Sequence, residues 1–132
     1  MPIPSPLLAI SGLRASYGKA EVLHGIDLQA HQGQVITVIG PNGAGKSTLL
    51  NTLMGILPGT GQMVFKGESI ATLTLEERVM LGLALVPEKR ELFGSLTVED
   101  NLLLGGFRQK KQGNAQWRST IDEVYQRFPR LQ

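Results

Sequence analysis

Residues 40–48 read GPNGAGKST, and they follow directly on the apolar run VITVI at 35–39. The stretch matches the phosphate-binding loop pattern G-x-x-x-x-G-K-[ST]. The preceding run is β-branched throughout and does not alternate with polar residues, which predicts a strand buried on both faces of a parallel sheet. The following residues, STLLNTLMGIL at 47–57, place apolar side chains at helical spacing, with Pro58-Gly59 as the predicted stop. The motif therefore stands in the strand–loop–helix context that it requires.

Each part of this loop has a predicted role in holding phosphate. Amides of a tight loop converge on an anion, and glycines at 40, 43 and 45 permit unusual φ values and a close backbone approach. The next helix directs the positive end of its dipole to the same place. Lys46 supplies a point charge, Ser47 a hydroxyl for Mg²⁺, and Thr48 contacts a phosphate or starts the helix. The predicted nucleotide-binding residues are Gly40, Pro41, Asn42, Gly43, Ala44, Gly45, Lys46, Ser47 and Thr48. The alternative is a glycine-rich turn before a helix.

The composition bounds the other possibilities. A chain of 132 residues, 42% of them hydrophobic, suits one small domain or part of a larger one. The net charge of +2, from 13 basic and 11 acidic residues, is too weak and too mixed to favour a nucleic-acid surface. The absence of cysteine excludes a disulfide framework. The start, residues 1–11, lacks the basic and apolar regions of a signal peptide, and no run of about 18 apolar residues predicts a membrane span.

The remaining segments predict a β-rich flank and a helical C-terminal part. A short strand is expected in 7–18, alternation predicts a half-buried strand in 22–33, and a further short strand is expected over 61–67. A second buried strand is expected over 83–86. The pairs Thr74/Glu77 and Thr97/Asp100 have capping-box spacing and predict two helix starts. Residues 108–113 are expected to form a solvated basic linker, and 114–128 a helix with Trp117, Ile121, Val124, Tyr125 and Phe128 on one face.

The stretch LRASYGKAEVLHGIDLQAHQGQVITVIGPNGAGKSTLLNTLMGIL at 13–57 resembles the N-terminal half of an ABC ATPase, the motor subunit of ATP-driven transporters. The resemblance runs the length of the chain. It implies an α/β fold: a P-loop NTPase core with an N-terminal antiparallel β-subdomain and the start of a helical subdomain, the whole incomplete. On this basis 1–132 is the N-terminal part of one ATPase domain, with β-subdomain and core over about 1–88 and the helical subdomain starting at about 89–132.

The resemblance assigns roles to two residues outside the loop. Tyr17 stands where the family keeps an aromatic that stacks on adenine; from the residues alone it is an ordinary strand-end aromatic. Glu88 stands where many members carry glutamine, near Mg²⁺ and the attacking water. The sequence VPEKR at 86–90 followed by LTVEDNL at 96–102 is similar to the ATPases of branched-chain amino-acid importers. The alternative for Glu88 is a solvated loop carboxylate. Lys46 and Glu88 are the two residues predicted to take part in catalysis.

Three family motifs are not found in this sequence: the L-S-G-G-Q signature, the apolar strand ending Asp-Glu, and a later switch histidine. Glu123 has no apolar strand before it, and His24 and His31 precede the loop. The chain is therefore interpreted as an N-terminal fragment that binds ATP with Mg²⁺, is poorly soluble alone and shows no steady-state hydrolysis. A soluble monomer whose turnover is abolished by Lys46→Ala would refute this expectation.

The resemblance also implies a setting for the parent protein. It predicts a peripheral subunit at the cytoplasmic face of the inner membrane that couples ATP hydrolysis to the transport of branched-chain amino acids. No nucleic-acid partner is expected. The implied partners are transmembrane permease subunits, a second and homologous ATPase subunit in a heterodimer, and indirectly a solute-binding protein. Three alternatives stay open: the ATPase of a related urea or amide importer, a truncated nucleotide-binding remnant without activity, and a soluble ABC ATPase of translation or repair.

Overall fold

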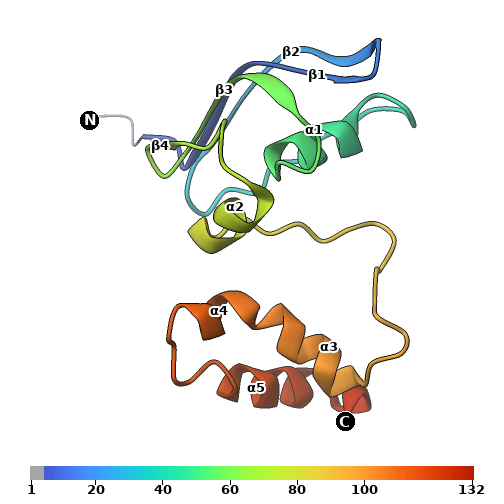
Figure 1. The fold of residues 1–132 in the computed structure, drawn as a ribbon, viewed down its shortest axis with the longest axis vertical. Coiled ribbons are helices and arrows are strands. Elements are labelled where there is room, and N and C mark those ends of the chain that lie inside the picture. The colour runs from blue at the N-terminus through green and yellow to red at the C-terminus, as the bar shows by residue number, and fades with distance from the viewer. Residues whose placement is uncertain (1–4) are drawn as a thin grey trace. The chain divides into compact units, whose positions relative to one another are not determined.

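The computed structural model describes residues 5–132, so the first four residues of the start lie outside the described part (Figure 1). The chain divides into two compact units, the first ending at Leu85 and the second running from Val86 to Gln132. The predicted division near residue 88 stays a prediction. None of the helices in residues 5–132 combines the length and the hydrophobicity that crossing a bilayer requires.

The first unit is built on an antiparallel sheet with the strand order β2-β1-β3-β4. Its strands are β1 (Leu8–Tyr17), β2 (Ala20–Ala30), β3 (Gly59–Phe65) and the short β4 (Glu68–Ser69). The three strands predicted over 7–18, 22–33 and 61–67 are confirmed. A tight turn at Gly18, with φ of 59°, joins β1 to β2, and Tyr17 pairs with Ala20 across it.

The central strand β1 carries a bulge at Gly12 where it pairs with both neighbours. The register jumps between Ile10 and Leu13 on the β2 side. Asp27 of β2 accepts a hydrogen bond of 2.7 Å from the Gly12 amide, which the bulge removes from the regular ladder. On the β3 side, Gly61 comes so close that an added Cβ would lie 2.7 Å from the Gly12 carbonyl oxygen. The bulge is therefore supported by a carboxylate on one side and a glycine on the other.

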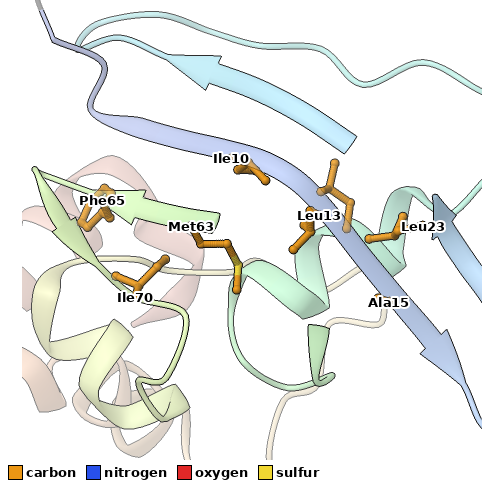
Figure 2. Close-up of a cluster of buried hydrophobic side chains, with 8 residues drawn as sticks. Ile10, Leu13, Ala15, Leu23, Met63, Phe65 and Ile70 are labelled. Atoms are coloured by element: carbon orange, nitrogen blue, oxygen red, sulfur yellow. The ribbon is translucent and has the colours of Figure 1, made fainter. Parts of the chain in front are cut away.

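One face of this sheet packs against the helix α1 (Lys46–Leu53) and forms the core of the unit (Figure 2). Leu13 and Ile70 are fully buried, and Met63 is 2% exposed. Burying a side chain of this size contributes about 1.5–3 kcal/mol. The core cluster comprises Ile10, Leu13, Ala15, Leu23, Leu49, Met63, Phe65 and Ile70. The helix contributes Leu49 to this cluster, so the element that follows the glycine loop is anchored in the core.

The helix α1 ends earlier than the sequence predicts. Its last residue is Leu53, whereas Pro58-Gly59 was the expected stop. Gly55 adopts a φ of 75°, and the amides of Ile56 and Leu57 both donate to the Asn51 carbonyl in a wider turn. A glycine in the left-handed region ends a helix in the manner typical of helix C-termini. Gly55 rather than the later proline therefore sets the end of this helix.

Helix α2 (Leu75–Leu81) begins with the predicted capping box. The Thr74 hydroxyl accepts from the Glu77 amide at 3.3 Å, and the Glu77 carboxylate accepts from the Thr74 amide at 2.8 Å. Gly82, with φ of 108°, caps the other end. The prediction of a helix start at Thr74 is confirmed, because the capping box is a local interaction that sequence spacing alone determines.

The two buried strands expected at 35–39 and 83–86 are not formed, and both predictions are wrong for this structure. Residues 34–41 and 83–88 have no regular secondary structure. Val35 is 94% exposed, Ile39 90% and Val86 91%. A strand of a parallel sheet needs hydrogen-bonded neighbours and covering helices. Within residues 5–132 no strand pairs with either segment, so their apolar side chains remain in solvent.

The exposure of residues 35–39 leads to a test of whether this segment is a buried strand or lies in solvent. Replacing both Val35 and Ile39 by lysine is expected to change the free energy of unfolding by no more than about 0.5 kcal/mol, as for other surface positions. It should also reduce self-association, since two large apolar side chains leave the surface. Urea unfolding and light scattering measure the two effects. Leu13→Lys, at a fully buried position, should unfold the unit. A loss of several kcal/mol in the double variant would mean that 35–39 is packed.

The second unit consists of short helices after an irregular segment. They are α3 (Val98–Gly105), α4 (Phe107–Lys111), α5 (Ser119–Arg127) and a 3₁₀ turn at Pro129–Leu131. The Thr97/Asp100 capping box predicted for α3 is confirmed. Asn101 also ties the preceding segment to α3, because its side chain accepts from the Phe93 amide at 3.0 Å and donates to the Phe93 carbonyl at 3.2 Å.

Two expectations for the second unit need correction. Residues 107–111, which overlap most of the expected basic linker at 108–113, form helix α4. The helix expected over 114–128 begins only at Ser119, so Trp117 precedes it. Trp117 packs instead at the α3–α4 junction, where an added Cβ on Gly106 would lie 2.8 Å from its ring. Cations from Lys110 and Arg118 lie over the same ring. Contacts around the indole thus explain why the segment on either side is ordered.

Candidate functional site

The glycine loop directly precedes α1 and is not helical itself. Residues 40–45 lie outside any helix, and α1 starts at Lys46. Gly43 and Gly45 adopt φ values of 85° and 90°, which favour glycine over other residues. The Ala44 amide donates to the Pro41 carbonyl at 3.2 Å and closes the turn. Gly40 has an ordinary φ, but an added Cβ there would lie 3.0 Å from the Ala44 Cβ.

The position of the loop is fixed by contact with the sheet. An added Cβ on Gly45 would lie 3.1 Å from Val22 Cγ1 and 3.2 Å from Leu23 Cδ2, both on β2. The next residues enter the core, where Thr48 is 6% and Leu49 5% exposed. Gly45 is therefore the residue at which the loop meets the sheet, and any larger side chain there would push against β2.

The start of α1 presents a set of backbone donors. In the described residues, no protein acceptor pairs with the amides of Gly43, Gly45, Lys46, Ser47 and Thr48. The first amides of a helix have no intrahelical partner, and the helix dipole adds a positive partial charge at the same end. Ser47 is exposed beside them, whereas Thr48 is buried. An anion of the size of a phosphate is the chemistry that such a set of donors suits.

Lys46 folds back across the loop. Its Nζ donates to the Gly40 and Pro41 carbonyls, each at 2.7 Å. These two bonds close the loop on itself and hold the ammonium against its first two residues. Among residues 5–132 the ammonium has no acidic partner, and neither carbonyl neutralises it, so the loop carries a full positive charge.

Tyr17 lies at the same end of the unit as the loop. Alternation along β1 places it on the face shared by Leu13 and Ala15, which face α1. Its partner Ala20 is two residues before Val22, which touches Gly45, a separation of about 7 Å along a strand. The ring is 52% exposed. Figure 1 shows the β1–β2 turn and the loop before α1 extending in the same direction.

The β1–β2 hairpin that carries Tyr17 is also joined by an ion-pair cluster. Arg14 Nη1 lies 2.9 Å from Glu21 Oε1, and His24 Nδ1 lies 3.2 Å from Glu21 Oε2. The hydrogen bond from Arg14, and then that from His24, lower the pKa of the Glu21 carboxyl. All three side chains are exposed, so the cluster adds little to stability.

Glu88 belongs to the second unit, and its carboxylate is exposed in the irregular segment before α3. The structure therefore groups Tyr17 and the loop residues 40–48 within one unit, and it does not place Glu88 with them. The predicted part of Glu88 in catalysis stays a prediction.

One buried cation of the first unit was not predicted from the sequence. Arg78 of α2 is 3% exposed, and burial lowers the pKa of its guanidinium. Its Nη1 donates to the carbonyls of Thr52 and Leu53, at 2.9 and 2.7 Å, at the end of α1. A signal was available: Leu75, Arg78 and Leu81 are spaced by three, so the arginine lies in line with apolar residues of a short helix.

A nucleotide-phosphate loop between a β-flank and a helix defines the class to which the fold and site point, the P-loop proteins. The sequence profile described as ABC transporter matches residues 23–131. The chain belongs to the ABC transporter ATP-binding family. Its predicted fold class is confirmed: an ABC ATPase cassette, in part, with an N-terminal antiparallel sheet and helices.

Individual relatives show how much of a cassette the chain covers. It is 38% identical, over 126 residues, to the high-affinity branched-chain amino acid transport ATP-binding protein BraG of Pseudomonas aeruginosa, covering 95% of this chain and 53% of the relative. It is 33% identical to the probable branched-chain amino acid transport ATP-binding protein LivF of Archaeoglobus fulgidus, covering 90% and 50%. The chain thus spans about half the length of these relatives.

Solved structures agree with this assignment. A nucleotide-free ATP-binding cassette from an ABC transporter is 30% identical and superposes with a TM-score of 0.69, over 76% of this chain and 40% of the other. The ADP conformation of the cassette MJ1267 gives a TM-score of 0.57 at 30% identity, over 60% and 32%.

Proposed function

We propose that this chain is the ATP-binding part of an ABC importer subunit that couples ATP hydrolysis to transport. The observation that carries the proposal is the loop at 40–48: unpaired amides at the start of α1, glycines at positive φ, and Lys46 held beside them. The loop thus offers two kinds of donor, backbone amides and the Lys46 ammonium, which suit the several charges of a triphosphate. The amides and Lys46 hold the β- and γ-phosphates.

The remaining predicted residues complete this proposed site. The exposed hydroxyl of Ser47 is a ligand for Mg²⁺, which keeps phosphate and water oxygens as its other ligands. The Tyr17 ring stacks on adenine from the end of β1. Glu88 takes part on the γ-phosphate side in the complete protein. The chain alone binds ATP without hydrolysing it, since it lacks an apolar strand ending in Asp-Glu.

Branched-chain amino acids are the solute class that the sequence favours. The segments VPEKR at 86–90 and LTVEDNL at 96–102 are similar to those of the corresponding importers, and BraG and LivF carry that solute class in their names. The xylose import protein XylG of Photobacterium profundum is 36% identical over 103 residues, so identity alone does not choose the solute. The two segments are therefore the basis of this part of the proposal.

The proposed partners are transmembrane permease subunits, a second ATPase subunit and, indirectly, a solute-binding protein, at the cytoplasmic face of the inner membrane. The second unit supports docking of a permease. A groove of about 390 Å³ runs over α3 and α4, with a mainly apolar lining and charged groups at its edge. Its lining residues are Leu96, Asp100, Leu103, Leu104, Phe107, Lys110, Trp117 and Arg118.

Calorimetric titration of the 132-residue chain with ATP and Mg²⁺ tests the proposal directly. Saturable binding at one site is the expected result, with adenosine as a weak competitor and tripolyphosphate as a stronger one. Circular dichroism should show that the chain is folded under the same conditions. A folded chain that does not bind ATP would contradict the proposed function.

The proposed stacking of Tyr17 on the adenine of ATP can be tested separately. Tyr17→Ala should weaken ATP binding by about 5- to 150-fold, which corresponds to the roughly 1–3 kcal/mol of a base–aromatic stack. Tyr17→Phe keeps the ring and should stay within about twofold of the wild type. The matched measurement is the affinity for tripolyphosphate, which has no base and should not change in either variant. Equal ATP affinity in Tyr17→Ala would leave Tyr17 as a strand-end aromatic.

A further inference from the structure

Arg78 joins three segments of the first unit through one buried side chain. Besides the Thr52 and Leu53 carbonyls of α1, its guanidinium donates to Leu73 O from Nε at 3.0 Å and to Ala71 O from Nη2 at 3.3 Å. The described residues include no carboxylate paired with it. All the compensation for burying this charge therefore comes from backbone carbonyls.

The choice of arginine at this position indicates a positioning role. A buried cation is costly compared with an apolar side chain of similar size. The end of a helix carries negative partial charge on its free carbonyls, so the guanidinium is attracted to the place where it is found. Its planar fork reaches four carbonyls at once, which the single ammonium of a lysine does not reproduce. The fork therefore fixes the end of α1 relative to residues 71–73 and α2.

Fixing one end of α1 affects the other end. The helix has eight residues, so it spans about 12 Å and behaves as a short rigid rod. Its first residues, Lys46 and Ser47, belong to the loop site. Thr52, the next-to-last residue of the helix, packs so tightly on Gly59 that a Cβ added to this glycine would collide with Thr52 Cγ2. The Arg78 bonds and this contact hold the same end of the helix, so a shift of that end would be transmitted along the rod and displace the amides at its start.

We propose that Arg78 is a positioning residue for the phosphate loop, which sets ATP affinity by holding the C-terminal end of α1 in place. The inference rests on the proposed function, since it concerns the strength of ATP binding. Arg78 touches neither the loop nor any residue assigned to the nucleotide. It acts through the orientation of α1, and the buried positive charge at the helix end adds to the same effect.

The test compares Arg78→Lys with a control that loses stability elsewhere. Phe65→Leu is the control, because Phe65 is a core residue of β3 and not part of α1 or of the Arg78 contacts. Both variants are measured by urea unfolding and by ATP calorimetry where circular dichroism shows them folded. Arg78→Lys should weaken ATP binding by about fivefold or more, the lower end of typical coupling between sites. Phe65→Leu should keep its affinity within about twofold.

A measurement on the wild type covers the case in which Arg78→Lys does not fold. The Arg78 Nε–Hε resonance, followed by NMR during the ATP titration, should shift and saturate at the ATP concentration found by calorimetry. Lys46→Ala should abolish the shift. Unchanged affinity in folded Arg78→Lys, or a stationary Nε–Hε resonance in the ATP-bound wild type, would overturn this inference alone. A folded wild type that does not bind ATP would overturn the proposed function together with it.

Discussion

Replacing Lys46 by alanine is expected to weaken ATP binding at least about 30-fold. A hydrogen bond to a charged group is worth roughly 1.5–3 kcal/mol, and a tenfold change corresponds to about 1.4 kcal/mol. In addition, the ammonium holds the loop closed through the Gly40 and Pro41 carbonyls, each at 2.7 Å. Its removal therefore takes away a phosphate contact and loosens the loop that aims the amides.

The control for this prediction is Lys19→Ala. Lys19 is exposed in the turn between β1 and β2 of the same unit, so its removal changes the net charge equally without touching the loop. Calorimetry should give an affinity within about twofold of the wild type for this variant, because Lys19 forms no bond to the loop and its exposed charge is screened by salt. If Lys46→Ala and Lys19→Ala bind ATP alike, general electrostatic attraction explains the binding and the loop geometry does not.

Local rules account for the parts of the fold that the sequence predicts well. The capping boxes at Thr74 and Thr97 depend on side chains three residues apart, and both are formed. The glycines at 43 and 45 take the positive φ values that the loop motif requires. The hairpin closes at Tyr17-Gly18, where the alternating pattern ends. In each case the interacting groups are neighbours in the sequence, so the pattern contains the cause of the structure.

The failures concern interactions between distant residues. The run at 35–39 has the composition of a buried strand, but burial depends on neighbouring strands that residues 5–132 do not supply. Arg78 shows the reverse: a charged side chain is buried because carbonyls of α1, about 25 residues earlier, accept its hydrogen bonds. The bulge at Gly12 is the exception, since a glycine inside a strand pattern is a local signal that often marks a bulge. The roles of Tyr17 and Glu88 depend on resemblance and stay predictions.

The other large effect is expected at Gly61, where two strands approach each other too closely for any side chain. Gly61→Ala would place Cβ 2.7 Å from Gly12 O and 2.9 Å from Leu13 Cα, at a φ of 118°. The contacts are with backbone, so no rotamer change relieves them. Strained φ alone costs about 1–3 kcal/mol, and displacing β1 at its bulge adds to this. We expect a total loss above about 4 kcal/mol, a large share of the 5–15 kcal/mol typical of a whole domain.

Gly67→Ala is the matched control, because it separates the cost of the positive φ from the cost of the collision between Cβ and the β1 backbone. Gly67 has a φ of 82°, and an added Cβ there meets nothing within 4 Å. Its substitution should cost about 1–2 kcal/mol, from the left-handed φ alone. Urea unfolding followed by circular dichroism gives both values, and the difference between them measures the contact between β1 and β3. Similar losses in the two variants would mean that β1 and β3 can move apart at the bulge, and the core beneath them, which includes Leu13 and Met63, would then tolerate that movement as well.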